Sequence, residues 1–339
     1  MEHREPLTFN VGNPVTESVE RVTVDGASTV HKTIRSGGDS GSSGYPPGDL
    51  PTDLNYWRRE SLVYRSDLRD WLAPHGIEMP TLLGEVDEGE RITLVLEDVD
   101  GVAGVAAEDA ALVDLARGWG AAQAALVDRP REGWLGADFM RTYLRHRPDE
   151  ALAFDDDRAW THPAVAAVID APLRDGLRRL WHDRWWCCDQ LADVPLTFGH
   201  HDLWPGNVIF RPDGAPVVLD WAFCGSSAFG LDMVVMILDT FFDLLVDVSR
   251  LDALESAMTG AWLDSVSARL DPKVALLGMW LSAARFSWLP VRTIENVQNG
   301  PLPSPYQEDG VTTEQQMAAW APVFERMVEW HESARGALA

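Results

Sequence analysis

The stretch that decides the fold reads Phe198-Gly-His-His-Asp-Leu-Trp-Pro-Gly-Asn-Val-Ile-Phe210 and is followed by Val217-Val-Leu-Asp-Trp221. It places Asp202 five residues before Asn207, and it places Asp220 at the end of a later apolar run. This spacing lets one carboxylate accept the proton of an attacking hydroxyl, while the other two side chains hold Mg²⁺ against the phosphates of a nucleotide. Oxygen ligands suit this hard cation, and two from the protein suffice because water and phosphate complete the octahedron.

The residues around these three side chains predict a hairpin. Val208–Phe210 and Val217–Leu219 have the composition of short strands, and Arg211–Pro216 between them is dense in turn residues. A hairpin would fold the second strand back beside the first and bring Asp220 close to Asn207. Each of the three polar residues alone could merely cap a turn or begin a loop. Their joint occurrence in this order, around a hairpin, favours a site.

A family resemblance rests on the same residues. His200-His-Asp-Leu-Trp-Pro-Gly-Asn207 and Leu219-Asp-Trp221 resemble the motifs His-Gly-Asp-Leu-His-Pro-Gly-Asn and Ile-Asp-Trp of the aminoglycoside phosphotransferase and choline kinase family. This sequence has His201 where Gly is usual and Trp204 where His is usual. Neither departure removes a catalytic or metal-binding group. His200 matches the structural histidine of the family, and we expect no proton transfer by it.

The resemblance implies an α+β, protein-kinase-like fold with two lobes. A small β-rich N-terminal lobe would bind the nucleotide within residues 1–98, and a larger, mostly helical lobe would carry the catalytic loop and the acceptor site within residues 99–339. The Gly-rich stretch Phe223–Asp232 also resembles the family's segment after the metal-binding Asp. Asp232 would brace that segment or simply cap a helix.

Lys32 is conspicuous because the chain contains only one other lysine, Lys273. It lies in Ser28–Ile34, a β-branched run with strand character that follows a similar run, Val19–Val24. A lysine on a strand that pairs with the α- and β-phosphates is what an ATP site requires. The alternative is a solvated strand lysine.

Glu60 is the partner of Lys32 that the resemblance implies. We expect it on a helix that Asp53 caps and that runs through Trp57, Leu62, Leu68 and Trp71. Glu60 could equally be a surface residue, because the neighbouring Arg58 and Arg59 offer it local partners.

Arg91–Val99 is predicted to be a buried strand, and it is similar to the linker between the lobes in the family. By that resemblance, backbone groups of Glu97 and Val99 would bind the edge of adenine. Asn10–Ser18 lies where relatives carry a loop over the nucleotide, but its single glycine allows no phosphate contacts to be assigned. Residues 36–52, rich in Gly, Ser and Pro, are expected to form a flexible loop.

The rest of the chain is predicted to be helical. Apolar residues recur at helical spacing, and we expect helices over 110–127, 139–146, 163–168 and 173–191, with several more from residue 233 onward. The tryptophans in these segments, such as Trp181, are expected to pack in the core. The most apolar stretch, Met233–Val246, contains two acids and is too short to span a bilayer, so it is predicted to be a buried helix.

Composition limits the partners. The chain has 339 residues, of which 46% are hydrophobic, so it can bury a substantial core. Its three cysteines suggest neither a disulfide framework nor a zinc site. No signal-peptide pattern opens the chain, which predicts a cytoplasmic protein. The formal charge of −25 argues against nucleic acid or an anionic membrane as a partner and favours a cationic acceptor. A general acidic bias would produce the same charge.

The function predicted from these residues and from the resemblance is transfer of the γ-phosphoryl group of ATP, with Mg²⁺, to a hydroxyl of a small molecule. An aminoglycoside-like antibiotic or another amino alcohol is the first choice of acceptor. A kinase that acts on Ser or Thr of a natural-product precursor peptide is the second. A nucleotide-binding scaffold that has lost catalysis is the third, and the presence of Lys32, Asp202, Asn207 and Asp220 argues against it.

Overall fold

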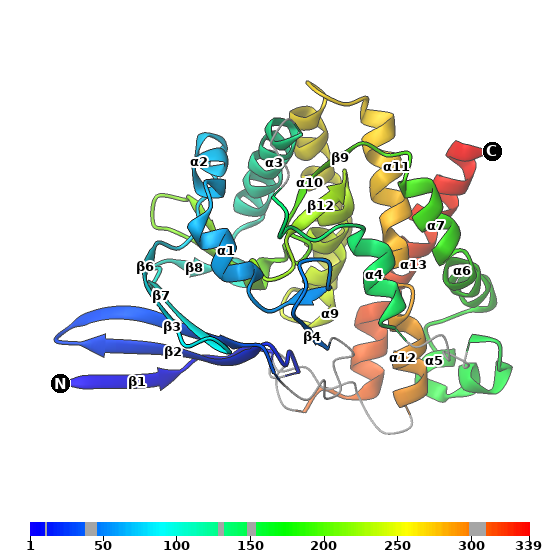
Figure 1. Cartoon of the computed structure of the whole chain (residues 1–339). Coiled ribbons are helices and arrows are strands. Elements are labelled where there is room, and N and C mark those ends of the chain that lie inside the picture. Colours follow the sequence, from blue (N-terminus) through cyan, green and yellow to red (C-terminus); the bar gives the residue numbers. More distant parts are fainter. Residues whose placement is uncertain (11, 38–45, 128–131, 148–153, 298–309) are drawn as a thin grey trace.

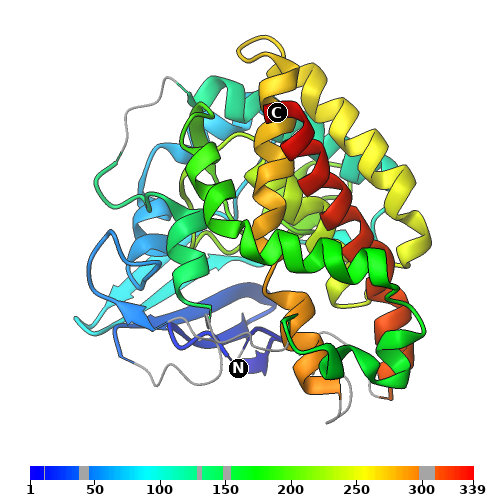
Figure 2. The same cartoon turned by 90° about the vertical axis from the view of Figure 1, so that its right-hand side faces the viewer.

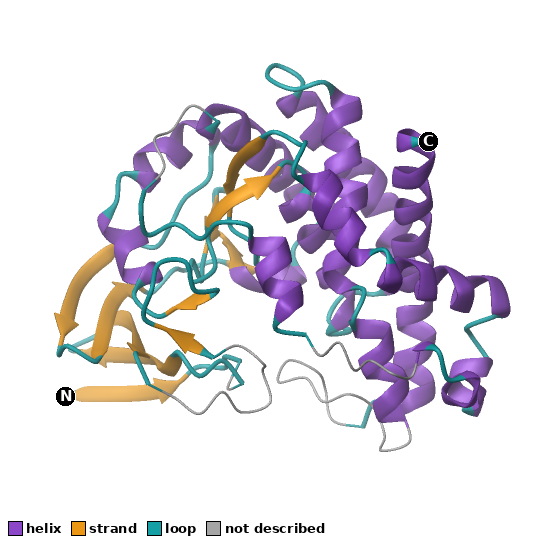
Figure 3. Cartoon of the chain, turned by 45° about the vertical axis from the view of Figure 1, so that its right-hand side comes forward, coloured by secondary structure: helices purple, strands orange, loops and turns teal. Residues whose placement is uncertain are grey.

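The N-terminal part of the protein is a five-stranded antiparallel sheet with the strand order β1-β2-β3-β7-β6. The computed structural model describes residues 1–10, 12–37, 46–127, 132–147, 154–297 and 310–339. In Figure 1 the sheet lies to one side of a larger, mostly helical part. The strands are β1 (Glu2–Pro6), β2 (Thr16–Val24), β3 (Ala27–Arg35), β6 (Leu82–Asp87) and β7 (Arg91–Glu97). Figure 3 shows the same segregation, with strands in orange and helices in purple.

The sheet has its own small core on one face. Buried residues alternate with less buried ones along β7, as the two-residue period of a strand requires. Ile34, Ile92, Leu94 and Leu96 pack there against Trp57. The strands predicted around residues 19–24, 28–34 and 91–99 are confirmed, although the last ends at Glu97. Of the predicted flexible loop 36–52, residues 38–45 lie outside the described residues.

The helix predicted to run from Asp53 past Trp71 is wrong in its start and its continuity. The Asp53 carboxylate accepts the N–H of Leu50 and closes a turn instead of capping a helix. Short parallel pairing of β4 (Pro47–Gly48) with β5 (Asn55–Tyr56) follows. The helical part is α1 (Arg59–Arg65) and α2 (Leu68–Leu72), separated at Ser66. Ser66 is extended, and its hydroxyl accepts the N–H of Leu68, which favours a new start over a continuing helix.

The predicted hairpin is confirmed. β10 (Val208–Phe210) pairs antiparallel with β11 (Pro216–Val218), and β8 (Val102–Ala103) pairs with the other edge of β10. Beyond the hairpin, Leu219 donates its N–H to the carbonyl of Asn207 at 2.8 Å. The residue before Asp220 is therefore fixed beside Asn207, as the sequence required.

The larger part of the protein is built from helices packed around one extensive core. The helices are α3 (Asp109–Leu126), α4 (Phe139–Arg145), α5 (Pro163–Ala166), α6 (Ala171–His182), α7 (Arg184–Leu191), α10 (Leu251–Val266), α11 (Pro272–Ser282), α12 (Leu289–Asn296) and α13 (Thr313–Leu338). Figure 2 shows α13, in red, lying beside α11, and residues of the two helices are in contact. A short pair of strands, β9 (Leu196–Gly199) and β12 (Gly225–Ala228), flanks the catalytic segment.

The helix expected over 173–191 is two helices that meet at Asp183. The first, α6, packs against α13, whereas the second, α7, packs against α11. The Asp183 carboxylate also binds the His331 side chain of α13, with 3.1 Å between Oδ2 and Nε2.

The predicted buried helix over Met233–Val246 is present in a modified form. It consists of α8 (Leu231–Val234), a π-helical turn η6 (Val235–Asp239) and α9 (Thr240–Phe242), and most of it is buried. A π-helical turn inserts a residue into an α-helix and is frequent at functional sites. It ends here at Asp239.

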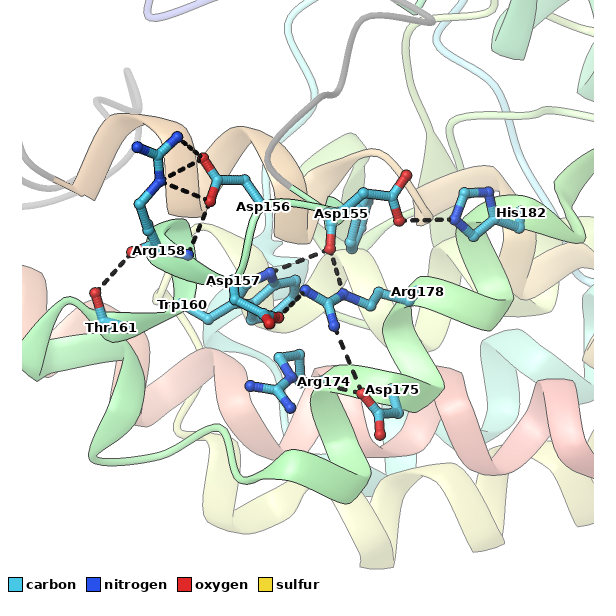
Figure 4. A network of polar contacts seen from close by, with 11 residues as sticks. Asp155, Asp156, Asp157, Arg158, Trp160, Thr161, Arg174, Asp175, Arg178 and His182 are labelled. Atoms are coloured by element: carbon cyan, nitrogen blue, oxygen red, sulfur yellow. Dashed lines mark hydrogen bonds and ion pairs between the residues drawn. The ribbon is translucent and has the colours of Figure 1, made fainter.

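Polar contacts hold the segment 154–161 on α6 at the surface (Figure 4). Arg178 binds the carbonyl of Phe154 and lies 2.7 Å from Asp157 Oδ1, while His182 lies 3.2 Å from Asp155 Oδ1. Such solvent-exposed pairs contribute little to the free energy of folding. Phe154 stacks on the core residue Trp181, with 5.7 Å between ring centroids, and this contact anchors the segment to the core.

One apolar run has the length and composition of a membrane span. It covers Pro272–Ile294, with a mean hydropathy of 1.3, but 67% of its apolar window is buried inside the structure. That burial is typical of a core helix. The three cysteines, Cys187, Cys188 and Cys224, are buried free thiols.

Candidate active site

A cleft of about 870 Å³ is lined by residues of both the sheet and the helical part. β2, β3 and β7 supply one side, and α4, α12, α13 and the 3₁₀ turn η8 (Ala283–Phe286) supply the other. The residues predicted to bind the nucleotide or the metal ion, or to act as the base, all line this cleft, namely Lys32, Glu60, Glu97, Val99, Asp202, Asn207 and Asp220.

Lys32 is held by two carboxylates. Its Nζ atom lies 2.7 Å from Glu60 Oε2 and 2.9 Å from Asp220 Oδ1, and its side chain is only 9% exposed. The structure therefore contains the Lys32–Glu60 ion pair, and the alternative of a solvated strand lysine is wrong. Burial alone would lower the pKa of Lys32, but the carboxylates of Asp220 and Glu60 outweigh it and raise that pKa. The side chain is therefore a fixed cation in the cleft.

The arginines beside Glu60 have other partners. Arg58 lies 3.1 Å from Asp87 Oδ2 on β6. Arg59 is fully buried, and its guanidinium donates to five backbone carbonyls, those of Pro51, Asp53, Leu54, Trp134 and Ala222. A buried guanidinium requires such saturation of its donors. Arg59 thus joins the start of α1 to the loop that follows Asp220.

Asp232 braces the catalytic loop and does not act as a helix cap. Its carboxylate accepts the N–H groups of His200 and His201 at 3.0 and 2.8 Å. It also accepts the indole N–H of Trp119 at 3.0 Å, and its side chain makes no capping bond to α8. Burial raises the pKa of Asp232 to about 6, against these hydrogen bonds. The carboxylate therefore fixes two consecutive peptide units just before Asp202.

His201, which stands where the family has Gly, has a left-handed backbone with φ of 65°. That conformation costs a non-glycine residue about 1–2 kcal/mol. Its ring stacks on Phe139, the first residue of α4, with 4.1 Å between centroids, and Nδ1 donates to the carbonyl of Phe223 at 2.8 Å. Burial lowers the pKa of His201 to about 3, so the ring is neutral. The ring thus links the catalytic loop to α4.

His200 has the structural role expected of it. Its Nε2 lies 2.9 Å from the carbonyl of Leu219, and its Nδ1 accepts the N–H of Asp202 at 3.2 Å. Burial lowers the pKa of His200 to about 4. This neutral ring connects the catalytic loop to the residue before Asp220.

Asp202 and Asn207 are in direct contact. Asn207 Nδ2 donates to the carbonyl of Asp202 and to its Oδ2, both at 2.9 Å. Arg285 Nη2 lies 3.9 Å from the other carboxylate oxygen of Asp202. Burial raises the pKa of Asp202 to about 6, although the charge of Arg285 opposes the rise. Such a carboxyl group is ionised at neutral pH and basic enough to accept a proton.

Asp220 and Asn207 fit a hard divalent cation. Asp220 follows β11 with a left-handed backbone, φ 56°, which Asp tolerates better than most residues. Lys32 lowers the pKa of Asp220 against the effect of burial, so this carboxylate is ionised. The amide nitrogen of Asn207 is engaged with Asp202, which leaves its Oδ1 as a ligand. Among the described residues no three His, Cys, Asp or Glu side chains gather as a metal site. A Mg²⁺ ion held by Asn207 and Asp220 would take its remaining ligands from phosphate and water.

Glu97 and Val99 lie at the edge of the cleft where β7 ends. The carboxylate of Glu97 is occupied elsewhere, because it accepts the Thr81 hydroxyl at 2.9 Å and pairs with Arg211 at 2.7 Å. Its backbone N–H donates to the carbonyl of Thr81. Any adenine contact at Glu97 must therefore use its carbonyl, while the side chain secures the linker.

The sequence analysis missed several residues on the helical side of the cleft. Arg285, Asp239, Phe139 and Tyr143 all line the cleft. Asp239 and Arg285 each interrupt an otherwise apolar, buried run, and a charge in such a run was the available signal. The two aromatic residues carried no such signal, because a core helix has the same composition.

A strand lysine paired with a helix glutamate, a braced Asp–Asn loop and a hairpin ending in Asp together define a kinase-like phosphotransferase. The phosphotransferase enzyme family (APH) matches residues 53–266 of the chain, which is more than half of it. The chain belongs to this family, and it is a kinase. The resemblance to aminoglycoside phosphotransferases seen in the motifs is thereby confirmed.

The solved structure of an amicoumacin kinase supports the fold. The amicoumacin kinase hAmiN, in complex with AMP-PNP, Ca²⁺ and Ami, is 13% identical, with 96% of this chain and 91% of that chain covered and a TM-score of 0.51. The aminoglycoside phosphotransferase APH(3'')-Id from Streptomyces rimosus is 17% identical over 85% of this chain and 92% of that chain, with a TM-score of 0.47. No curated protein sequence matches the chain. The protein has the two-lobed, kinase-like α+β fold.

Proposed function

We propose that the protein transfers the γ-phosphoryl group of Mg·ATP to a hydroxyl of a small molecule, with an aminoglycoside-like antibiotic or another amino alcohol as the acceptor. One observation carries this proposal. Lys32, paired with Glu60 and Asp220, lines the same cleft as Asp202, the proposed base. We call the part of the cleft around Asp202, Asp239 and Asp243 the acceptor side. We also propose that the enzyme acts in the cytoplasm, where ATP is available.

Each residue then has a role that its position supports. Lys32, held by Glu60, would orient the phosphates, and the carbonyl of Glu97 with the backbone of Val99 would bind adenine. Asn207 and Asp220 would hold Mg²⁺, which supplies charge neutralisation of the phosphates when it is bound.

Asp202 would take the proton of the attacking hydroxyl. It is the cleft carboxylate that Asn207 orients and that Arg285 keeps ionised at neutral pH. The protein performs little covalent chemistry, and positioning with charge stabilisation supplies the rate.

The acceptor side of the cleft supports an amine-bearing alcohol. Asp239 and Asp243 line it next to Asp202. Burial, together with the charges of Asp202 and Asp243, raises the pKa of Asp239 to about 8. An ammonium group placed there would favour the ionised carboxylate and gain a charge-assisted hydrogen bond. Trp288 and Trp320 also line the cleft and offer aromatic faces to the carbon frame of an acceptor.

Incubation with γ-labelled ATP and panels of aminoglycosides, macrolides, simple amino alcohols and peptides tests the proposal. We expect label in at least one amine-bearing small molecule and none with Asp202→Asn, a variant of nearly identical volume. Label in peptides alone would favour the precursor-peptide kinase. Calorimetric binding of Mg·ATP without transfer to any acceptor or to water would favour the inactive scaffold.

A further inference from the structure

Aromatic side chains gather on the acceptor side of the cleft, and a series of contacts leads to them from the proposed base. Arg285 Nη2 lies 3.9 Å from Asp202 Oδ1, and the Arg285 guanidinium carbon lies 5.3 Å from the centre of the Phe286 ring. The ring centroid of Phe242 lies 5.3 Å from that of Phe286 and 6.0 Å from that of Trp320. All three rings line the cleft, so they form one continuous aromatic wall that starts near Asp202.

This aromatic wall is rigid and apolar. Phe242, Phe286 and Trp320 are 7%, 4% and 4% exposed, and Phe242 meets each of the other two rings edge to face, which is a favourable arrangement. The Trp320 indole N–H donates to the carbonyl of Phe242 at 2.9 Å, so the polar atom of the indole is satisfied within the protein. A wall held in this way has little conformational entropy to lose when a ligand packs against it.

Asp239 lies on the same helical stretch as Phe242. The π-helical turn η6 ends at Asp239, and α9 continues from Thr240 to Phe242. Residues three apart lie on one face of a helix, and both side chains line the cleft. The carboxylate of Asp239 and the aromatic wall therefore face the same space, and one acceptor molecule can contact both.

This combination favours an acceptor with two unlike ends. An ammonium group suits the carboxylate of Asp239. A hydroxyl-rich surface does not suit the wall, because hydroxyl groups that pack against apolar rings lose their hydrogen bonds to water without replacement. An apolar ring gains free energy both from leaving water and from contact with the aromatic side chains.

We propose that Phe242, Phe286 and Trp320 form a subsite for an apolar ring of the acceptor, beside the carboxylate of Asp239. The inference rests on the proposed function, because it assigns the ring to the molecule that is phosphorylated. It narrows the acceptor class to amino alcohols that also carry an aromatic or alicyclic ring. An aminoglycoside whose rings all bear hydroxyl and amino groups would offer the wall no matching group.

The test measures binding and needs no turnover. The protein is titrated, by ligand-observed NMR, with phenylethanolamine and separately with isopropanolamine, in which a methyl group replaces the phenyl ring. Excess Mg·AMP-PNP is present throughout, so that the phenyl ring cannot bind in place of adenine. Deoxystreptamine serves as a ring that bears only hydroxyl and amino groups. We expect phenylethanolamine to bind at least about tenfold more tightly than the other two compounds, as burial of a phenyl ring predicts.

Two substitutions remove one ring of the wall and keep an apolar side chain. Phe242→Leu and Phe286→Leu should each weaken the binding of phenylethanolamine about threefold or more, as loss of one aromatic pair predicts, and should change the binding of isopropanolamine little.

Phe324→Leu is the matched control. The Phe324 ring lies 6.5 Å from the Phe242 ring, but the residue is fully buried and does not line the cleft. This variant loosens the same aromatic cluster without removing a contact to the ligand, so it should bind phenylethanolamine like the wild type. Melting temperatures report the folding of each variant.

Equal affinities of the wild type for phenylethanolamine and isopropanolamine would overturn the subsite, and this comparison needs no variant. A preference for the phenyl compound that survives in both wall variants, or that is lost equally in Phe324→Leu, would overturn it too. Each of these results would leave phosphotransfer untouched, because the labelled-ATP experiment reports on it separately. A preference that depends on Phe242 and Phe286, without phosphotransfer to any compound, would instead remove the proposed function and keep the apolar subsite.

Discussion

Replacing Arg285 by Gln should shift the acid limb of the pH–rate profile, because Arg285 lowers the pKa of Asp202. In the wild-type protein that pKa is about 6. Asp202 acts as a base only when ionised, so the rate should fall as pH drops through that value. Loss of the neighbouring positive charge raises the pKa and therefore moves the limb to higher pH.

The size of the shift follows from the geometry. Arg285 Nη2 and Asp202 Oδ1 are 3.9 Å apart, and the carboxylate side chain is 27% exposed. A charge at that distance contributes about 1 kcal/mol in a water-like medium and about 4 kcal/mol at an effective dielectric constant of 20. One pKa unit corresponds to about 1.4 kcal/mol. We expect a shift of about one unit or more, which at pH 6 leaves roughly a tenth of the variant's plateau rate.

The assay is ADP formation from Mg·ATP between about pH 5 and 9, which covers the acid limb expected for both proteins. The best acceptor of the panel, or water, serves as the acceptor. Arg285→Lys is the matched control, since it keeps the charge, and its limb should stay near that of the wild type. Arg285 also donates to the carbonyl of His201, a contact that the shorter Gln side chain would lose and that melting temperatures would report. An acid limb that stays in place in Arg285→Gln would refute either the charge coupling or the assignment of Asp202 as the base.

Other substitutions test the rest of the site. Asp202→Asn and Asp220→Asn should each reduce ADP formation by about 10³-fold or more. The melting temperature should change little in Asp202→Asn but fall in Asp220→Asn, which removes one of the two carboxylates that pair with Lys32. Near-normal rates would contradict the roles of both residues. Glu60→Gln breaks a buried ion pair, so it should lower the melting temperature and weaken Mg·ATP binding about tenfold in calorimetry. Unchanged binding would show that Glu60 does not help to bind the nucleotide. His201→Gly should relieve about 1 kcal/mol of backbone strain, because glycine tolerates the left-handed conformation. It should also raise the KM for the acceptor, because the His201 ring no longer positions Phe139. An unchanged KM would show that His201 has only a structural role.

The hairpin and the catalytic loop could be predicted from the sequence because their signals are local. Turn residues between two apolar triplets fixed the pairing of Val208–Phe210 with Pro216–Val218. The rarity of lysine singled out Lys32, and the structure places its ammonium between the carboxylates of Glu60 and Asp220.

Elements that depend on distant partners could not be predicted in this way. The chain divides at Asp183 into two helices that pack against different neighbours, and a π-helical turn that ends at Asp239 interrupts the mostly apolar run. Periodicity alone describes each of them as one helix. The acceptor wall is also assembled from residues far apart in the chain, such as Tyr143 and Arg285.

The five carbonyls bound by Arg59 have a consequence for regulation. In many protein kinases the helix that carries the glutamate partner of the ATP lysine swings in and out, and activity follows its position. Here the residue next to Glu60 is anchored to both Trp134 and Ala222, so outward rotation of α1 would strand a desolvated cation. We therefore expect α1 and Glu60 to keep the same position with and without a bound nucleotide, so that this helix does not serve as a switch.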